Sequence, residues 1–395
     1  MDHAELTALL TPEGLRLVDE LGVIVSPADV TGAVSRLRAS GLSPDLVSAA
    51  VGQARLRGRA RAKFGPFAER MLFTRAGLEQ ATRLSVAARH AGRFRDTGVT
   101  RVADLGCGIG GDALGFAGIG LDVLAVDADE ITAAIAAYNL APFGDAATVT
   151  SARAEDVDLS GVDAVWLDPA RRTAGHTETT RVGAADWSPS LDWVFDLAGR
   201  VPAGVKLGPA FDRTLIPDDV EAQWISVDGS TIELVLWSGT LARDGIRRAA
   251  LVIRGDAAHE LTAGDDTDDA AVRELGEYVH EPDGAVIRAR LIGEVARSLD
   301  AGMLDPKIAY LTSDAAVTSP FVQSFRVRER LPSDAKALAR ALKDRGIGTL
   351  EIKKRGVDVD PAALRTKLKL RGPESATLIL TRVGSTRLTL LADRI

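Results

Sequence analysis

Cysteine is nearly absent from this 395-residue sequence, which contains a single thiol, Cys107. One cysteine excludes an intrachain disulfide and any zinc site built from cysteines. The five histidines are scattered without the spacing of metal ligands, at His3, His90, His176, His259 and His280. We therefore expect no metal site.

Long apolar runs are absent too. The longest, such as residues 133–138 and 249–253, fall far short of the ~20 residues that span a bilayer. Residues 1–20 contain five acidic side chains and no basic start, unlike a secretory signal. Hydrophobic residues make up 46% and charged residues 26%, as in ordinary soluble proteins. We expect a cytoplasmic protein without membrane contact.

Charge is distributed unevenly along the chain. Residues 321–395 hold 17 Lys and Arg against 8 Asp and Glu, a net charge of +9, whereas the rest has a net charge of −16. Such an asymmetry favours an anionic partner for the basic part. A merely solvated charged surface is the alternative.

The pattern along the chain predicts several regions. Residues 1–95 are expected to be helical, with Ser26-Pro27 and Ser43-Pro44 as helix starts and residues 74–94 as one amphipathic stretch. Between residues 96 and 240, short apolar strands alternate with helical segments, which predicts an α/β domain with a mostly parallel sheet. The expected strands are 101–105, 122–126, 147–151, 164–167, 204–207, 223–227 and 232–237.

The remainder divides into two parts. Residues 241–320 show a weak pattern and are interpreted as an extension or linker. Residues 321–395 predict a separate α+β domain of the order βαβαββ, with strands at 323–331, 349–354, 376–383 and 387–391 and helices at 333–345 and 361–370.

A glycine-rich loop at residues 102–112 leaves the first strand and opens a helix. Its glycines allow a ligand to approach backbone N–H groups at the helix start. Gly106, Gly108 and Gly111 also satisfy the fingerprint of dinucleotide-binding enzymes. However, Asp104 at the strand end suits the ammonium group of S-adenosylmethionine better than NAD. A purely structural turn is the third interpretation.

Acidic residues also follow the next three strands. Asp127, followed by Ala128, is placed to accept hydrogen bonds from ribose hydroxyls, and Glu155-Asp156 to meet an adenine amino group. Asp168-Pro169 ends the fourth strand, above the crevice where such sheets bind ligands. Four acids at successive strand ends favour S-adenosylmethionine.

With these residues the sequence resembles class I S-adenosylmethionine-dependent methyltransferases. More narrowly, it resembles a bacterial family with a C-terminal THUMP-like, ferredoxin-like domain, through segments 78–82, 168–172, 281–283 and 350–356. The resemblance implies a Rossmann-like α/β fold and the cofactor S-adenosylmethionine. It also implies that Gln80 and Thr82 close over the cofactor, and that the binding residues are Asp104, Gly106, Cys107, Gly108, Gly110, Asp112, Asp127, Ala128, Glu155 and Asp156.

The candidate catalytic residues are Asp168, Pro169, Arg171 and Arg172. Asp168 and the Pro169 carbonyl could hold a planar amino group or ring nitrogen, and an arginine could stack on a base or bind a phosphate. No aromatic residue follows Pro169, so stacking by such a side chain is not expected there. Cysteine-dependent C5 methylation is excluded, because Cys107 belongs to the cofactor loop. Lys206, at the end of the next strand, is either a substrate contact or a lysine extended toward solvent.

The basic C-terminal domain predicts an RNA-docking surface that contacts phosphates through Lys353, Lys354, Arg355, Lys367 and Lys369. The predicted activity is therefore N-methylation of a nucleotide in a structured RNA, either tRNA or rRNA. A weakly active or inactive methyltransferase fold that binds RNA, and a methyltransferase acting on protein or small-molecule nitrogen, are the alternatives.

Overall fold

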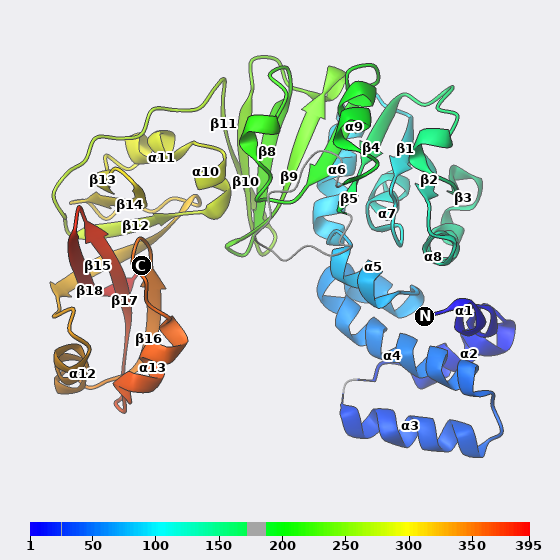
Figure 1. Cartoon of the computed structure of the whole chain (residues 1–395), viewed down its shortest axis with the longest axis horizontal. Coiled ribbons are helices and arrows are strands. Elements are labelled where there is room, and N and C mark those ends of the chain that lie inside the picture. Colours follow the sequence, from blue (N-terminus) through cyan, green and yellow to red (C-terminus); the bar gives the residue numbers. More distant parts are fainter. Residues whose placement is uncertain (25, 172–186) are drawn as a thin grey trace. The chain divides into compact units, whose positions relative to one another are not determined.

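The computed structural model describes residues 1–24, 26–171 and 187–395, which form two compact units (Figure 1). The first unit comprises Met1–Leu207 and Leu236–Ala242, and the second comprises Gly208–Val235 and Arg243–Ile395. The helical region and most of the expected α/β domain therefore share one unit. No helix among the described residues has the length and apolar character needed to cross a membrane.

The N-terminal region is helical, as predicted. Ser26 and Ser43 cap the third and fourth helices by accepting hydrogen bonds from the Asp29 and Leu46 backbone N–H groups. The helices of this region are α1 (His3–Leu9), α2 (Pro12–Leu21), α3 (Pro27–Ala39), α4 (Pro44–Phe64), α5 (Arg75–Gln80) and α6 (Leu84–Asp96).

The stretch 74–94 differs from the expected single helix, because it breaks between α5 and α6. Ala81 and Arg83 adopt extended backbone conformations at the break. Lys63 Nζ donates to the carbonyl oxygens of Leu78, Glu79 and Ala81 at 2.9, 2.8 and 2.7 Å and so caps the end of α5. Residue 82 is thereby held in a turn and not on a helix face.

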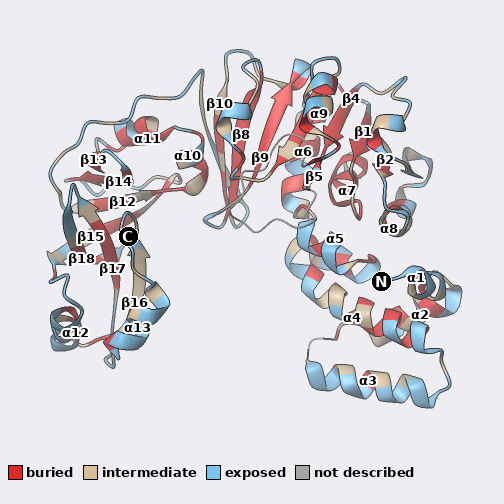
Figure 2. Ribbon diagram, viewed as in Figure 1, coloured by how far each residue is buried: buried red, intermediate tan, exposed pale blue. Residues whose placement is uncertain are grey.

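A parallel sheet forms the centre of the first unit. Its strands lie in the order β7-β4-β1-β2-β3, and each pairing described within this group is parallel. The strands match the predicted ones closely. Strands β1, β4 and β7 are largely buried, whereas β3, the last strand of the order, is half-buried to exposed (Figure 2). They are β1 (Arg101–Leu105), β2 (Asp122–Asp127), β3 (Ala147–Ser151), β4 (Ala164–Leu167) and β7 (Ala203–Leu207). The helices α7 (Gly111–Gly118), α8 (Glu130–Leu140) and α9 (Leu191–Ala198) connect strands of this sheet.

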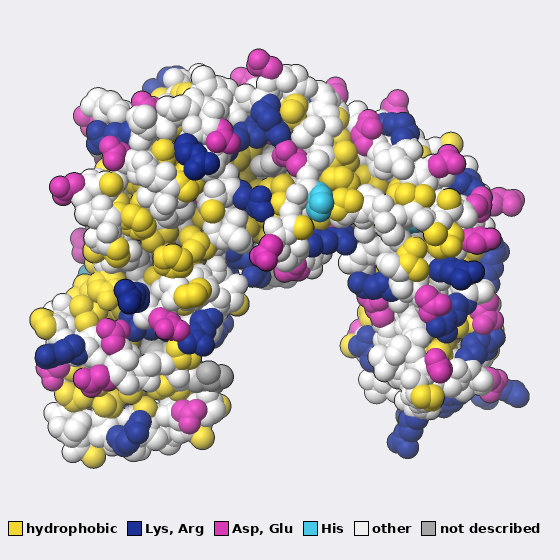
Figure 3. Space-filling model, turned by 180° about the vertical axis from the view of Figure 1, so that it is seen from behind, with side chains coloured by type: hydrophobic (Ala, Val, Ile, Leu, Met, Phe, Trp, Pro, Cys, Tyr) yellow, Lys and Arg dark blue, Asp and Glu magenta, His cyan; other side chains and the backbone are white. Residues whose placement is uncertain are grey.

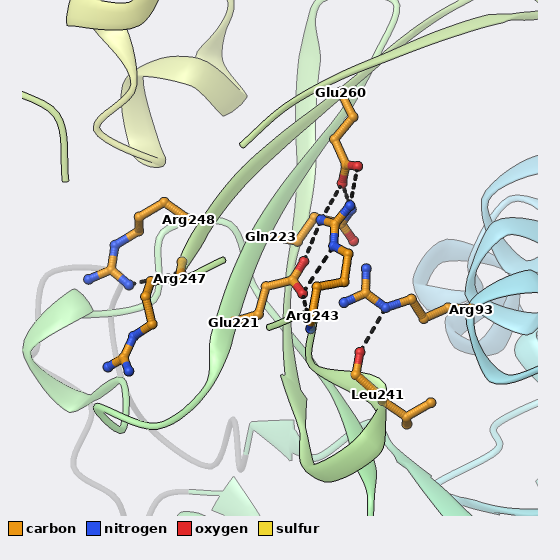
Figure 4. Close-up of polar contacts among 8 residues, drawn as sticks. All are labelled: Arg93, Glu221, Gln223, Leu241, Arg243, Arg247, Arg248 and Glu260. Atoms are coloured by element: carbon orange, nitrogen blue, oxygen red, sulfur yellow. Dashed lines mark hydrogen bonds and ion pairs between the residues drawn. The ribbon is translucent and has the colours of Figure 1, made fainter. Parts of the chain in front are cut away.

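The second unit begins with a strand group that includes β8 (Glu221–Val227), β10 (Arg248–Arg254) and β11 (Ala257–Ala263). Strand β8 pairs parallel with β10, which pairs antiparallel with β11. Strand β9 (Ser230–Ser238) begins in this unit and ends in the first. The guanidinium of Arg243 lies between Glu221 and Glu260, 2.6 Å from a carboxylate oxygen of each (Figure 4).

The C-terminal sheet has seven strands in the order β13-β14-β12-β15-β18-β17-β16. The elements predicted after residue 321 are confirmed as β15 (Val322–Arg330), α12 (Ala335–Asp344), β16 (Ile347–Lys354), α13 (Pro361–Leu368), β17 (Glu374–Val383) and β18 (Thr386–Arg394). The expected linker differs, because part of it contributes strands to the same sheet, with β12 pairing antiparallel with β15. The additional elements are β12 (Tyr278–Pro282), α10 (Gly284–Arg288), α11 (Ile292–Ser298), β13 (Gly302–Asp305) and β14 (Ile308–Ser313).

Candidate active site

The glycine loop connects β1 to α7 at the carboxyl edge of the parallel sheet. Gly106, Gly108 and Gly110 all have positive φ angles, of 94°, 56° and 86°, which side chains other than glycine rarely adopt. A Cβ atom at Gly106 would lie 2.8 Å from the Asp168 carbonyl oxygen. The loop after β1 and the end of β4 therefore meet at van der Waals distance, which requires glycine at position 106.

Asp104 is the most unusual acid of the site. Its side chain is 1% exposed, and neither carboxylate oxygen has a hydrogen-bond partner among the described residues. Burial, together with the negative charges of Asp112 and Asp168, raises the pKa of Asp104 well above its ordinary value. A buried acceptor pair without donors matches a ligand that brings an ammonium group, as S-adenosylmethionine does.

Asp127 ends β2 beside the same loop. Its two carboxylate oxygens accept hydrogen bonds from the Gly108 and Asp129 backbone N–H groups, at 3.0 and 2.9 Å. Partial burial raises the pKa of this carboxyl group, and the hydrogen bonds act in the opposite direction. The backbone thus holds Asp127 in place, and its remaining lone pairs suit the expected ribose hydroxyls.

The other expected cofactor residues differ in how far they are buried. Glu155 and Asp156 follow β3, and Arg153 forms ion pairs with both, at 2.9 and 4.0 Å. Gln80 and Ala128 are exposed, whereas Cys107 is buried. Burial also raises the pKa of the Cys107 thiol, which suits a packing role in the loop rather than that of a nucleophile.

Asp112 is the centre of a buried polar network. Its carboxylate accepts a hydrogen bond from Thr82 Oγ1 at 2.7 Å and lies 2.9 Å from His90 Nδ1. Burial raises the pKa of Asp112, but Lys206, His90 and Thr82 together lower it to about 2. Thr82 and Asp112, two of the residues predicted to bind the cofactor, are thus hydrogen-bonded to each other.

Lys206 joins this network to the end of β4. Its ammonium group lies 2.5 Å from Asp168 Oδ2, 3.0 Å from Thr82 Oγ1 and 3.7 Å from Asp112 Oδ2. The lysine side chain is 12% exposed, so it does not extend into solvent. Asp168 itself is 33% exposed and remains reachable from outside.

The arginines of the same segment are described only in part. Arg171 belongs by its backbone to β5 (Ala170–Arg171), which pairs antiparallel with β6 (Trp187–Ser188). The side chain of Arg171 and the whole of Arg172 lie outside the described residues. Their expected contacts with an acceptor stay predictions.

His90 is a site residue that the sequence did not indicate. It lies on the buried face of α6, and its ring stacks on Trp166 of β4 with a centroid distance of 4.4 Å. On a single sequence, one histidine within an amphipathic helix resembles any core residue. Only the packing of α6 brings it to Asp112.

The five basic residues predicted to contact RNA fall into two groups. Lys353 and Arg355 are half-buried and lie 2.9 and 3.4 Å from the carboxylate of Glu281. The segments 281–283 and 350–356, which are remote in sequence, therefore meet in the C-terminal sheet. Lys354, Lys367 and Lys369 are exposed and form no ion pair with any residue that the structure describes.

Comparison with known proteins decides the family. Two uncharacterized S-adenosylmethionine-dependent methyltransferases of Mycobacterium tuberculosis, from strains CDC 1551 and H37Rv, are each 35% identical to the chain over 339 residues. The match covers 84% of this chain and 91% of theirs. The chain belongs to the class I S-adenosylmethionine-dependent methyltransferases.

Further similarities concern the individual parts of this methyltransferase. Residues 322–394 match the THUMP domain-like family, and residues 2–60 match a domain of unknown function, DUF8688. A solved structure of a proposed methyltransferase from Porphyromonas gingivalis W83 has the same fold, with a TM-score of 0.71 at 19% identity. That similarity covers 94% of this chain and 99% of the other.

The methyltransferase uses S-adenosylmethionine, which supplies an electrophilic methyl group on a sulfonium centre. The buried, donor-free carboxylate of Asp104 and the glycine turn fit this cofactor. The binding of its ammonium group by Asp104 and of its ribose by Asp127 stays a prediction. No group of three or more His, Cys, Asp or Glu side chains in the described part of the methyltransferase is arranged to hold a metal ion.

Proposed function

We propose that this methyltransferase modifies a nitrogen atom of a nucleotide in a structured RNA. The observation that carries the proposal is the position of Asp168. It ends β4, touches the cofactor loop through its backbone at Gly106, and keeps its carboxylate partly exposed. An acceptor that reached Asp168 would lie next to the expected cofactor site.

In this proposal Asp168 positions the acceptor and accepts its proton. An amino or ring N–H group would donate to the partly exposed carboxylate of Asp168, while the Pro169 carbonyl accepts a second hydrogen bond. Lys206 holds Asp168 in place through the ion pair between its ammonium group and Asp168 Oδ2. The main contribution of the protein to the rate of methyl transfer is to hold the methyl donor and the acceptor in the right orientation.

Charge supports RNA as the acceptor. The THUMP-like domain has a net charge of +9 over residues 321–395, and in Figure 3 Lys and Arg side chains gather over it with Asp and Glu among them. Lys354, Lys367 and Lys369 are among its exposed cations and could bind phosphates. We therefore propose that this domain docks the RNA.

The test is transfer of a labelled methyl group from S-adenosylmethionine to bulk RNA and bulk protein from the same cells. With the parent protein we expect labelled RNA. With Asp168→Asn we expect the label in RNA to be lost, while the affinity for S-adenosylmethionine, measured by calorimetry, stays nearly unchanged. Asp192→Asn, which alters an exposed carboxylate in the first turn of α9, is the matched control. Label in protein alone would overturn the choice of acceptor, and equal rates in Asp168→Asn would overturn the role of Asp168.

A further inference from the structure

A basic segment of the N-terminal region lies largely outside the methyl-transfer site. Residues 51–75 contain seven Lys and Arg against one acid, Glu69. Among them only Lys63 serves the site, through its cap on α5. Strongly basic segments bind anions when their cations converge on one place.

Three of these arginines converge on a cavity of about 340 Å³ within the first unit. Arg57 and Arg61 come from α4, and Arg70 from the short turn that follows it. The lining residues are Asp19, Gly22, Val23, Arg57, Arg61, Glu69 and Arg70. Three guanidinium groups thus face two carboxylates, so that donors outnumber acceptors.

Arg57 lines the cavity and has one donor without a hydrogen-bond partner among the described residues. The residue is 2% exposed; Nε donates to the Met71 carbonyl oxygen at 3.0 Å and Nη1 to Asp19 Oδ1 at 2.7 Å. Its Nη2 atom is buried and has no hydrogen-bond partner among the described residues. A buried cationic donor without an acceptor is costly, and an anion in the cavity would supply one.

The other two arginines can adapt to such an anion. Arg61 is exposed and forms an ion pair with Glu69 at 2.5 Å. Arg70 is exposed and forms no ion pair with any residue that the structure describes. Guanidinium groups bind phosphate oxygens through two parallel hydrogen bonds, so a phosphate matches the site in charge and geometry.

We infer that this cavity is a phosphate-binding site, occupied by a backbone phosphate of the acceptor RNA. The phosphate chemistry follows from the arginines alone, whereas the choice of RNA as its source rests on the proposed function. Exposed Arg55, one helical turn before Arg59 on α4, extends the positive surface beyond the cavity. The N-terminal region would then hold RNA independently of the THUMP-like domain.

The experiment measures binding of inorganic pyrophosphate and of bulk structured RNA (tRNA and rRNA) to the full chain by calorimetry. Arg61→Gln with Arg70→Gln should weaken pyrophosphate binding roughly tenfold or more, since each loses charge-assisted hydrogen bonds. Glu69→Gln should strengthen binding, because it removes a competing carboxylate and releases Arg61. Arg36→Gln with Arg38→Gln is the control; it removes two exposed cations of α3 in the same region.

The outcomes are separable from those of the methylation assay. The inference is supported if the protein with Arg61→Gln and Arg70→Gln binds both pyrophosphate and RNA more weakly than the parent, while the control protein binds both as the parent does. Weakening of pyrophosphate with unchanged RNA binding would keep the phosphate site but overturn RNA as its source. Equal affinities for parent, test and control proteins would overturn the site itself, whether or not RNA is methylated.

Discussion

Lys206 Nζ lies 2.5 Å from Asp168 Oδ2 and, on its other side, 3.0 Å from Thr82 Oγ1. One ammonium group thus connects the acceptor side of the site to the buried network around Asp112. The position of the Asp168 carboxylate, the candidate acceptor-binding group, therefore depends on the network that includes His90 of α6 and Asp112 of α7.

Replacing Lys206 by Met should therefore affect both turnover and acid stability. Lys206 is the largest factor lowering the pKa of Asp112, which is about 2 in the folded chain. A depressed pKa contributes stability above the unfolded value of ~3.9 that is lost as the pH falls toward 2. In Lys206→Met the acid unfolding midpoint should move to higher pH, as followed by tryptophan fluorescence, and methyl transfer should fall. Lys336→Met, at an exposed lysine, should change neither.

Asp104→Asn should stabilise the cofactor-free protein but weaken its binding of S-adenosylmethionine. The pKa of Asp104 is raised in the folded chain, so folding stability falls as the pH rises from ~3.9 through the folded value. Removing the charge should raise the melting temperature of the cofactor-free protein at pH 7. It should also weaken S-adenosylmethionine binding at least several-fold in calorimetry. A variant that melted earlier and bound the cofactor normally would contradict both assignments.

Gly106→Ala should disrupt the contact between the cofactor loop and the end of β4. The φ angle of 94° and the 2.8 Å approach of a Cβ atom to the Asp168 carbonyl oxygen both oppose a side chain. We expect a loss of about 1–3 kcal/mol in the free energy of unfolding, together with weaker cofactor binding. Gly118→Ala, near the end of α7 with open space around it, is the control and should be neutral or stabilising.

Arg243→Met tests the ion pair of the second unit. Glu221 is fully buried, and the substitution removes the guanidinium group that pairs with it. We expect a loss of about 3 kcal/mol in denaturant unfolding, the lower end of the usual range, because Arg243 is 33% exposed. Arg247→Met, at a neighbouring arginine without an ion pair among the described residues, should cost far less (Figure 4).

The THUMP-like domain offers a comparison between its two groups of cations. Alanine at Lys354, Lys367 and Lys369 should reduce the slope of log RNA affinity against log salt by about 2–3 without changing stability. Alanine at Lys353 and Arg355 should instead lower the melting temperature, because both pair with Glu281. A salt titration and a thermal melt of each variant measure the difference. If the first group left the slope unchanged, the exposed lysines would not contact RNA.

Much of the molecule is determined locally by its sequence. The parallel strands of the first unit follow from short apolar runs, and the starts of α3 and α4 follow from Ser-Pro pairs whose capping acts over three residues. The glycine loop and the acids at strand ends are equally local, because the carboxyl ends of parallel strands share one edge. These patterns were sufficient to predict the fold and the cofactor.

What tertiary structure decided is which charged groups meet. Thr82 and His90 are remote in sequence from Asp112 and Lys206, and the break between α5 and α6, with the packing of α6, brings the four together. The same holds for Glu281 with Lys353 and Arg355, which cross-link strands within a sheet that the sequence pattern divided at residue 321. A local sequence pattern indicates which helices and strands form and which of their residues are buried. The partner of a charged side chain, in contrast, comes from a segment that is remote in sequence and becomes its neighbour only after folding.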